Sequence, residues 1–191
     1  MAVPLRGETG PRGAIVAGRH AGHVLGVLDR VACPACRRPD DVAHGIDVIG
    51  RAAATFDRVV VGVVREPHHK QTLFTVEERV AFLEEALAGL SNVKVDVFHE
   101  FVVDFARRHD AKTMVKGLRV IADFEWEFQM NRLNHLLAPE IETMYVMSSP
   151  QYSFISSSGV KEIASFGGKV DELVPEAVAR RFRELFPNGR P

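Results

Sequence analysis

Short apolar runs of strand length alternate with helical stretches along most of this chain, and this alternation limits the folds that the sequence can adopt. The strand-like runs lie at 24–34, 57–64, 93–98, 112–118 and 142–147. Between them apolar residues recur at helical spacing, and two more helical stretches follow at 157–168 and 175–186. Strands that alternate with helices predict a parallel sheet with right-handed crossovers. We therefore expect a single α/β domain with helices on both faces of its sheet.

Length and charge exclude several classes of protein. The 191 residues suffice for one sizeable core, and a formal net charge of −1 gives no overall field that would attract nucleic acid or an anionic membrane. No apolar run reaches membrane-spanning length, and two cysteines, Cys33 and Cys36, cannot build a disulfide framework. We expect a cytoplasmic protein that binds neither nucleic acid nor membranes. Residues 1–22 are rich in Gly, Arg and Pro without a period, so we predict a disordered extension at 1–28 and the domain at 29–187.

Local signals mark the ends of three predicted helices. Thr75 and Glu78 have the spacing of a capping box at the start of the helix after the second strand. Gly167 can end the helix that begins near residue 157, and Pro175 can open the last one. These signals agree with the alternation of strands and helices.

Groups suited to phosphate follow the predicted fourth strand. In open parallel sheets, ligands bind beyond the carboxyl ends of the strands. Lys116 and Arg119 flank Gly117 there; an ammonium can meet a phosphate, and a glycine lets the backbone approach a ligand. A solvated strand end is the plainer alternative. Glu127 lies one helical turn past Asp123, so both can share a face, although ordinary surface acids would look the same.

Two other predicted strands are followed by similar groups. Ser156, Ser157 and Ser158 precede a helix, where free amides and hydroxyls together suit a phosphate, whereas simple N-capping needs only one serine. Tyr152 and Phe154 before them could pack on a purine or fill the core. After the second strand, Lys70 lies in a polar loop, where a solvated lysine is the alternative, and the adjacent pair at 68–69 is a poor metal site because neighbouring histidines point in different directions.

Several of these segments resemble one known family. The stretches "VVDFARRHDAKTMVKGLRVIADFEWEFQMNRLNHLL" and "PQYSFISSSGVKEIASFGGKVDELVPEAV" are similar to bacterial phosphopantetheine adenylyltransferases, and the likeness covers about 29–186. The resemblance implies a Rossmann-like nucleotidyltransferase domain. Members of the family join ATP and 4′-phosphopantetheine into dephospho-coenzyme A and pyrophosphate with Mg²⁺, and they generally assemble as homohexamers.

The resemblance also assigns expected roles to residues of this chain. The expected catalytic residues are His44, Lys70 and Lys116. Residues expected on the pantetheine side are Cys36, Lys70, Val102 and Lys116. Residues expected to hold ATP are Cys36, Arg37, His44, Gly117, Leu118, Arg119, Glu127, Tyr152, Ser153, Phe154, Ile155, Ser156, Ser157 and Ser158. No protein ligand for a metal is implied, and Mg²⁺ is expected with ATP. Because a phosphate oxygen of the substrate is the nucleophile, catalysis rests on positioning and charge neutralisation without a protein base.

The stretch "CPACRRPDDVAHGID" at 33–47 departs from the family pattern "CPGSFDPVTNGH-x-D". Cys36 stands at the hydroxyl position, and Arg37 and Arg38 replace an aromatic residue and an acid. Two residues instead of one separate His44 from Asp47. Each inserted residue rotates a helix by about 100°, so His44 can be turned away from its expected direction.

Three explanations of this stretch stay open. Cys33, Cys36 and His44 could bind zinc, although one Cys-x-x-Cys pair is a weak signal. The loop could instead be a divergent one whose arginines bind phosphate. The third is a local double frameshift in the gene or its sequencing: shifted by one base, codons for 38–41 can read Asp-Pro-Met-Thr, close to the family pattern, and resequencing tests this. Two alternative functions also stay open. Because this stretch is disrupted, the chain could be an impaired homologue that binds adenine nucleotide or coenzyme A without turnover. Separately, it could be a related enzyme that adenylylates another phosphate or a carboxylate.

Overall fold

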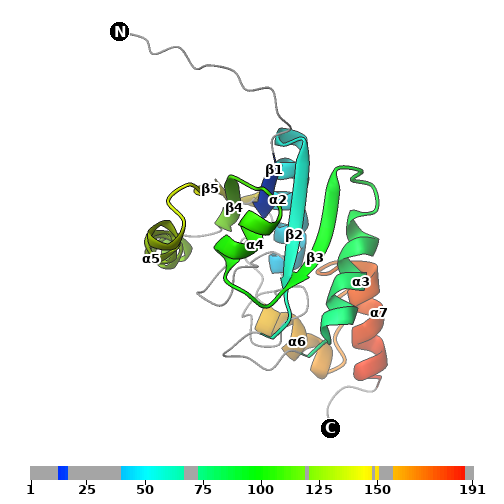
Figure 1. The fold of residues 1–191 in the computed structure, drawn as a ribbon. Coiled ribbons are helices and arrows are strands. Elements are labelled where there is room, and N and C mark those ends of the chain that lie inside the picture. The colour runs from blue at the N-terminus through cyan, green and yellow to red at the C-terminus, as the bar shows by residue number, and fades with distance from the viewer. Residues whose placement is uncertain are drawn as a thin grey trace.

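The computed structural model describes residues 13–16, 40–66, 73–118, 121–147, 149–150 and 157–187. Within these ranges one parallel sheet has the strand order β3-β2-β1-β4-β5 (Figure 1). Its strands are β1 (Gly13–Val16), β2 (Arg58–Val64), β3 (Val93–Phe98), β4 (Thr113–Leu118) and β5 (Glu142–Met147). The helices are α2 (Asp40–Thr55), α3 (Val76–Leu87), α4 (Val102–Arg108), α5 (Ile121–Leu137), α6 (Ser157–Ser165) and α7 (Glu176–Leu185).

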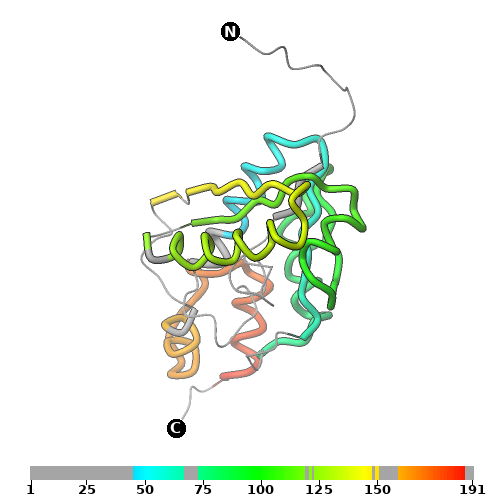
Figure 2. Tube along the Cα trace, turned by 60° about the vertical axis from the view of Figure 1, so that its left-hand side comes forward, coloured from blue at the N-terminus to red at the C-terminus, as the bar shows by residue number. Residues whose placement is uncertain are grey.

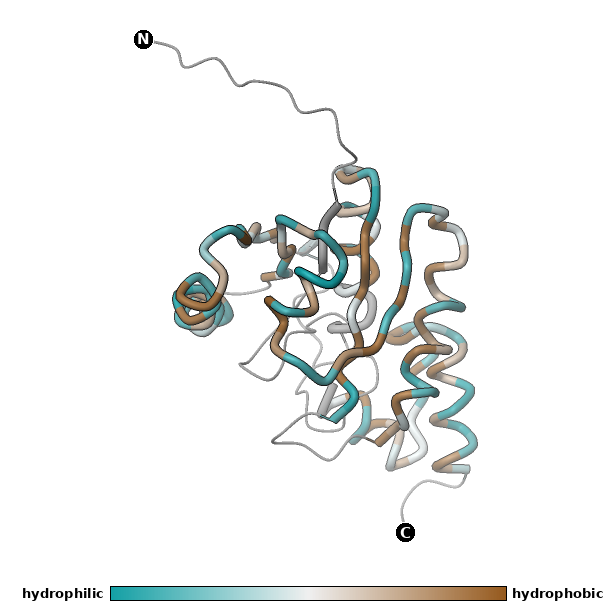
Figure 3. Tube along the Cα trace, viewed as in Figure 1, coloured by the Kyte–Doolittle hydropathy of each residue, from teal (hydrophilic) through white to brown (hydrophobic). Residues whose placement is uncertain are grey.

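Helices cover both faces of the sheet. Strand β2 is buried from Val59 to Val64, and its successive valines enter two separate cores because neighbouring strand residues point to opposite faces. Helices α2, α3, α6 and α7 contribute to one core, and α4 contributes to the other. The tube of β2 is correspondingly apolar in Figure 3, and Figure 2 shows α5 running alongside β5. The prediction of a single α/β domain with helices on both faces is confirmed.

The strand order reverses at β1, which pairs with both β2 and β4. The first half of the chain builds outward to β3, and the second half returns across β1 to β4 and β5. Such a switch point opens a crevice at the carboxyl ends of the two central strands. The order is that of a Rossmann-like sheet, and it places the end of β4 beside the crevice.

The local helix signals are confirmed. The Glu78 amide donates to Oγ1 of Thr75 at 3.2 Å, and the Thr75 amide donates to Oε2 of Glu78 at 2.8 Å, which completes the capping box. Gly167 follows α6 with a φ of 79°, a conformation that favours glycine and ends the helix. Pro175 directly precedes α7. In the part of the chain that is described, no helix combines the length and the apolar character needed to cross a bilayer.

The first strand differs from the prediction. Residues Gly13–Val16 pair with β2 and β4, so the predicted disordered extension is wrong for these four residues. Their sequence ends in Ile15 and Val16, and such β-branched residues favour strands. The strand predicted at 24–34 lies outside the described residues, and the domain boundary at residue 29 stays a prediction.

Candidate functional site

Lys116 forms a buried ion pair at the carboxyl half of β4. Its Nζ lies 2.6 Å from Oε2 of Glu127 on α5, and both side chains are only 1% exposed. The hydroxyl of Tyr145 on β5 donates to the carbonyl oxygen of Glu127 at 3.0 Å, which fixes this turn of the helix. The alternative of a solvated strand end at Lys116 is therefore wrong. The ammonium lies in the interior, where charge–charge interactions are stronger than in water.

The environment of Tyr145 favours its neutral form. Burial raises the pKa of the phenol to about 12, and the nearby charge of Glu127 raises it in the same direction. The hydroxyl therefore stays a hydrogen-bond donor across the physiological range. The hydrogen bond from Tyr145 therefore holds Glu127 in position from β5, in addition to the contacts that β4 and α5 provide.

One face of α5 connects this ion pair to a cavity. Asp123, Glu127, Met130 and Asn134 are buried, and their spacing of four, three and four residues places them in a single stripe. The prediction that Asp123 and Glu127 share a face is confirmed, and the reading of both as surface acids is wrong. The stripe is acidic near β4 and becomes apolar, with one amide, towards its other end.

A cavity of about 690 Å³ lies between the β3–α4 connection and α5. Its lining includes Val64, Phe98, Glu100, Val102, Met130 and Asn134. Val102, expected from the resemblance on the pantetheine side, thus lies in the cavity wall. Most of this lining is apolar, with carboxylates of Glu66, Glu100 and Asp104 among it. Such a cavity suits a flexible organic arm that carries a few polar groups.

Asn134 is a lining residue that the sequence analysis missed. It is 6% exposed, and its Nδ2 has no hydrogen-bond partner among the described residues. A buried donor without a partner costs about 1–3 kcal/mol, so such groups often serve a ligand. The sequence did contain a signal that could have identified Asn134. It lies seven residues after Glu127, so both side chains lie on the same face of the helix.

The remaining end of β4 lies at the carboxyl edge of the sheet. Gly117 pairs with Val146 and Leu118 with Met147 of β5, and Leu118 is buried. Both residues were expected to hold ATP, and this edge is where ligands of parallel sheets bind. Arg119, the next residue, lies outside the described part of the chain.

Helix α2 is fastened to the end of β5. Ser149 donates from its amide and its hydroxyl to the carboxylate of Asp47, at 3.2 and 3.1 Å. Arg51 donates to the carbonyl oxygen of Met147 at 2.5 Å. These contacts bring the helix that contains His44 to the point where the chain leaves β5 towards the expected ATP-binding run at 152–158.

Of the other expected site residues, the structure describes three and leaves the rest outside the described ranges. His44 belongs to α2, which begins four residues earlier at Asp40. Ser157 and Ser158 form the start of α6. The expected residues outside the described ranges are Cys36, Arg37, Lys70, Arg119 and 152–156. The described residues contain no group of three His, Cys, Asp or Glu side chains that could hold a metal ion, and the proposed zinc ligands Cys33 and Cys36 are not among them.

Comparison with known proteins identifies the class that this fold and crevice define. The Cytidylyltransferase-like family matches residues 43–163, well over half of the chain, and the chain belongs to this class of nucleotidyltransferase-type domains. The match begins at Ala43, after most of the divergent stretch at 33–47.

Curated relatives narrow the class. The phosphopantetheine adenylyltransferase of Alkaliphilus metalliredigens is 47% identical over 140 residues, which cover 73% of this chain and 88% of the relative. That of Symbiobacterium thermophilum is 46% identical over 162 residues, 85% of this chain and 99% of the relative. That of Gloeobacter violaceus is 48% identical over 148 residues, which cover 77% of this chain and 91% of the relative. The chain belongs to the phosphopantetheine adenylyltransferase family.

Proposed function

We propose that this protein transfers the adenylyl group of ATP to 4′-phosphopantetheine, giving dephospho-coenzyme A and pyrophosphate. The observation that carries the proposal is the stripe on α5, which runs from the buried Lys116–Glu127 pair to a cavity with an unpaired amide donor. This arrangement lies in a chain 46–48% identical to proteins named for that activity. The ammonium of Lys116 at one end of this arrangement and the largely apolar cavity at the other match a substrate with a phosphate at one end and a neutral arm at the other.

The arm of phosphopantetheine fits the chemistry of the cavity. The substrate carries methyl groups, two amides and a thiol, which need apolar walls and a small number of hydrogen bonds. Val102 and Met130 supply apolar surface, and Nδ2 of Asn134 supplies a donor for an amide oxygen. We expect Cys36 and Lys70 on the same side of the substrate.

Lys116 is the proposed phosphate ligand in this half of the site. In the structure its charge is balanced by Glu127, so a bound phosphate would share the ammonium with that carboxylate. As a phosphate oxygen attacks the α-phosphorus, negative charge builds up, and Lys116 would neutralise it together with Lys70 and His44. Removal of one such contact raises the barrier by roughly 2–4 kcal/mol.

The ATP half of the site is proposed at the edge formed by β4, β5 and the start of α6. Helix-start amides at Ser157 and Ser158 suit the phosphates, and the backbone of Gly117 and Leu118 lies at the same edge. The other proposed ATP ligands are Cys36, Arg37, His44, Arg119, Glu127, Tyr152, Ser153, Phe154, Ile155 and Ser156. Mg²⁺ is proposed to enter with the triphosphate, because this ion is held largely by substrate phosphates and water, and when bound it offsets their charge.

Assembly into a hexamer is proposed from an exposed apolar surface on α5 and β5. Large apolar side chains there that do not line the cavity are 44–56% exposed: Phe124, Trp126, Phe128, Met144 and Met147. Strand β5 is also an edge of the sheet. Apolar surface of this extent on a folded chain favours burial against another protein, and a further copy of the same chain is the proposed partner.

We place the protein in the cytoplasm, where ATP is available.

A pyrophosphate-release assay with ATP, Mg²⁺ and 4′-phosphopantetheine tests the activity. We expect release that depends on both substrates and that falls by about 30-fold or more in Lys116→Met. A parallel titration with ATP distinguishes the alternatives, because an impaired homologue would bind ATP without releasing pyrophosphate. Release with another phosphate or a carboxylate, but not with phosphopantetheine, would instead identify the related enzyme considered above.

A further inference from the structure

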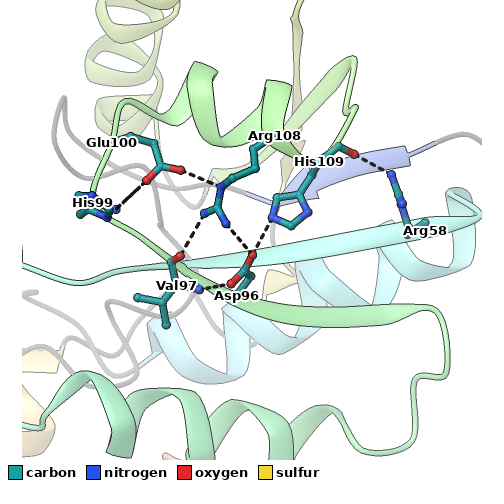
Figure 4. Close-up of polar contacts among 7 residues, drawn as sticks. All are labelled: Arg58, Asp96, Val97, His99, Glu100, Arg108 and His109. Carbon is teal, nitrogen blue, oxygen red and sulfur yellow. Dashed lines mark hydrogen bonds and ion pairs between the residues drawn. The ribbon is translucent and has the colours of Figure 1, made fainter.

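One wall of the cavity is held in place by a residue that does not line it. The connection from β3 to α4, His99–Phe101, forms this wall, and Arg108 in the last turn of α4 folds back against it (Figure 4). Nε of Arg108 donates to Oε1 of Glu100 at 3.0 Å. Its Nη2 donates to the carbonyl oxygen of Val97 at 3.1 Å.

The same guanidinium is anchored to β3. Nη1 of Arg108 donates to Oδ2 of Asp96 at 3.2 Å, and Nε2 of His109 lies 2.8 Å from the same oxygen. Arg58 of β2 donates to the carbonyl oxygen of His109 at 2.6 Å, and this bond holds the end of α4 against β2. The guanidinium also lies 5.0 Å from the ring centroid of Phe105, a favourable cation–aromatic distance.

Glu100 is the point at which this network meets the cavity. Its Oε2 accepts from the amide of His99 at 3.0 Å, so the carboxylate also fixes the main chain of the β3–α4 connection next to Glu100 itself. Burial alone would raise the pKa of Glu100, but the amides of His99 and Glu100 and the charge of Arg108 together lower it below its ordinary value. The carboxylate therefore stays ionised, and bonded to Arg108, over the working range of pH.

We propose that Arg108 is a positioning residue for the arm of the substrate: it holds the His99–Phe101 wall in the shape that phosphopantetheine requires. The inference rests on the proposed function and goes beyond it, because Arg108 contacts no expected substrate group. Its three donors reach a carboxylate of the loop, a carboxylate of β3 and a main-chain carbonyl at once. A lysine has one nitrogen on a flexible stem and cannot reproduce this planar arrangement, so Arg108→Lys should restore binding only in part.

Calorimetric titration of the full chain with 4′-phosphopantetheine and, separately, with ATP tests the inference. We expect Arg108→Ala to weaken phosphopantetheine binding about fivefold, because the free loop must be ordered when the ligand binds, and to leave ATP binding unchanged. Arg183→Ala is the matched control: Arg183 is similarly exposed and also pairs with two carboxylates, Asp171 and Glu176, but it lies on α7. This control should bind both ligands as the wild type does.

Glu100→Ala and the double variant with Arg108→Ala complete the test. If Arg108 acts through Glu100, the double variant should bind phosphopantetheine no more weakly than Glu100→Ala alone. Equal binding by Arg108→Ala and the wild type would overturn the inference while leaving the proposed function intact. Equal weakening of both ligands would also overturn it, since that is the signature of a general structural role. Failure of the wild-type chain to bind phosphopantetheine would overturn the proposed function itself, and this inference with it.

Discussion

Nζ of Lys116 and Oε2 of Glu127 lie 2.6 Å apart in a part of the molecule where neither side chain is more than 1% exposed. The pair joins the fourth strand to the long helix beside it. Its consequence for stability is asymmetric, because loss of one buried charge leaves the other uncompensated, whereas loss of both does not.

Glu127→Gln is expected to destabilise the protein strongly. The amide keeps the shape of the side chain but leaves the ammonium of Lys116 without its buried carboxylate, a change that costs about 3–5 kcal/mol. Urea denaturation followed by circular dichroism measures this as a lower free energy of unfolding. The double variant Lys116→Met/Glu127→Gln should lose less than the sum of the two single variants, and strictly additive losses would contradict the coupling.

The ionisation of Tyr145 gives a prediction at alkaline pH. Its pKa is raised to about 12 in the folded protein, above the ordinary value of 10.0. The folded state therefore retains the phenolic proton longer than the unfolded state, and the associated stability is complete below pH 10 and is lost as the pH rises towards 12. Absorbance titration of phenolate measures this directly in Tyr152→Phe, since the chain has only two tyrosines. A midpoint near 10 in the folded variant would contradict the prediction.

Helices and strands of this fold could be predicted from the sequence where they depend on residues only a few positions apart. Strand β3 begins and ends at the predicted residues, and the capping box at Thr75 marks the start of α3, because strand period and helix capping depend on neighbours within a few positions. The alternation of strands and helices also predicted that both faces of the sheet are covered, and β2 is accordingly buried from Val59 to Val64.

Contacts between distant segments could not be predicted in this way. Asp47 and Ser149 are 102 residues apart in the sequence, and only the folded sheet brings α2 to the end of β5. The strand at Gly13–Val16 could not be predicted for the same reason. Short β-branched runs occur both at 13–16 and at 24–34, and local propensity cannot decide which one pairs between β2 and β4.

Asn134→Leu should separate stability from binding. Leucine has nearly the same shape and removes a buried donor that has no partner in the described structure, so the free energy of unfolding should stay the same or rise by about 1 kcal/mol. Phosphopantetheine loses the amide donor, and we expect its binding to weaken about tenfold by calorimetry, with ATP binding unchanged. A less stable variant that binds phosphopantetheine normally would show that the amide serves the fold and not the ligand.

Phe128→Glu should disrupt assembly. Phe128 is 47% exposed on the apolar surface of α5, and a carboxylate there would lose its hydration when two copies pack together. Phe166→Glu is the control, because Phe166 is 70% exposed but follows α6, whose buried residues belong to the core on the other face of the sheet. We expect sedimentation velocity to give a hexamer for the wild type and for Phe166→Glu, and a smaller species for Phe128→Glu. A wild-type monomer would refute the proposed assembly, and an intact hexamer of Phe128→Glu would place its interfaces away from this part of α5.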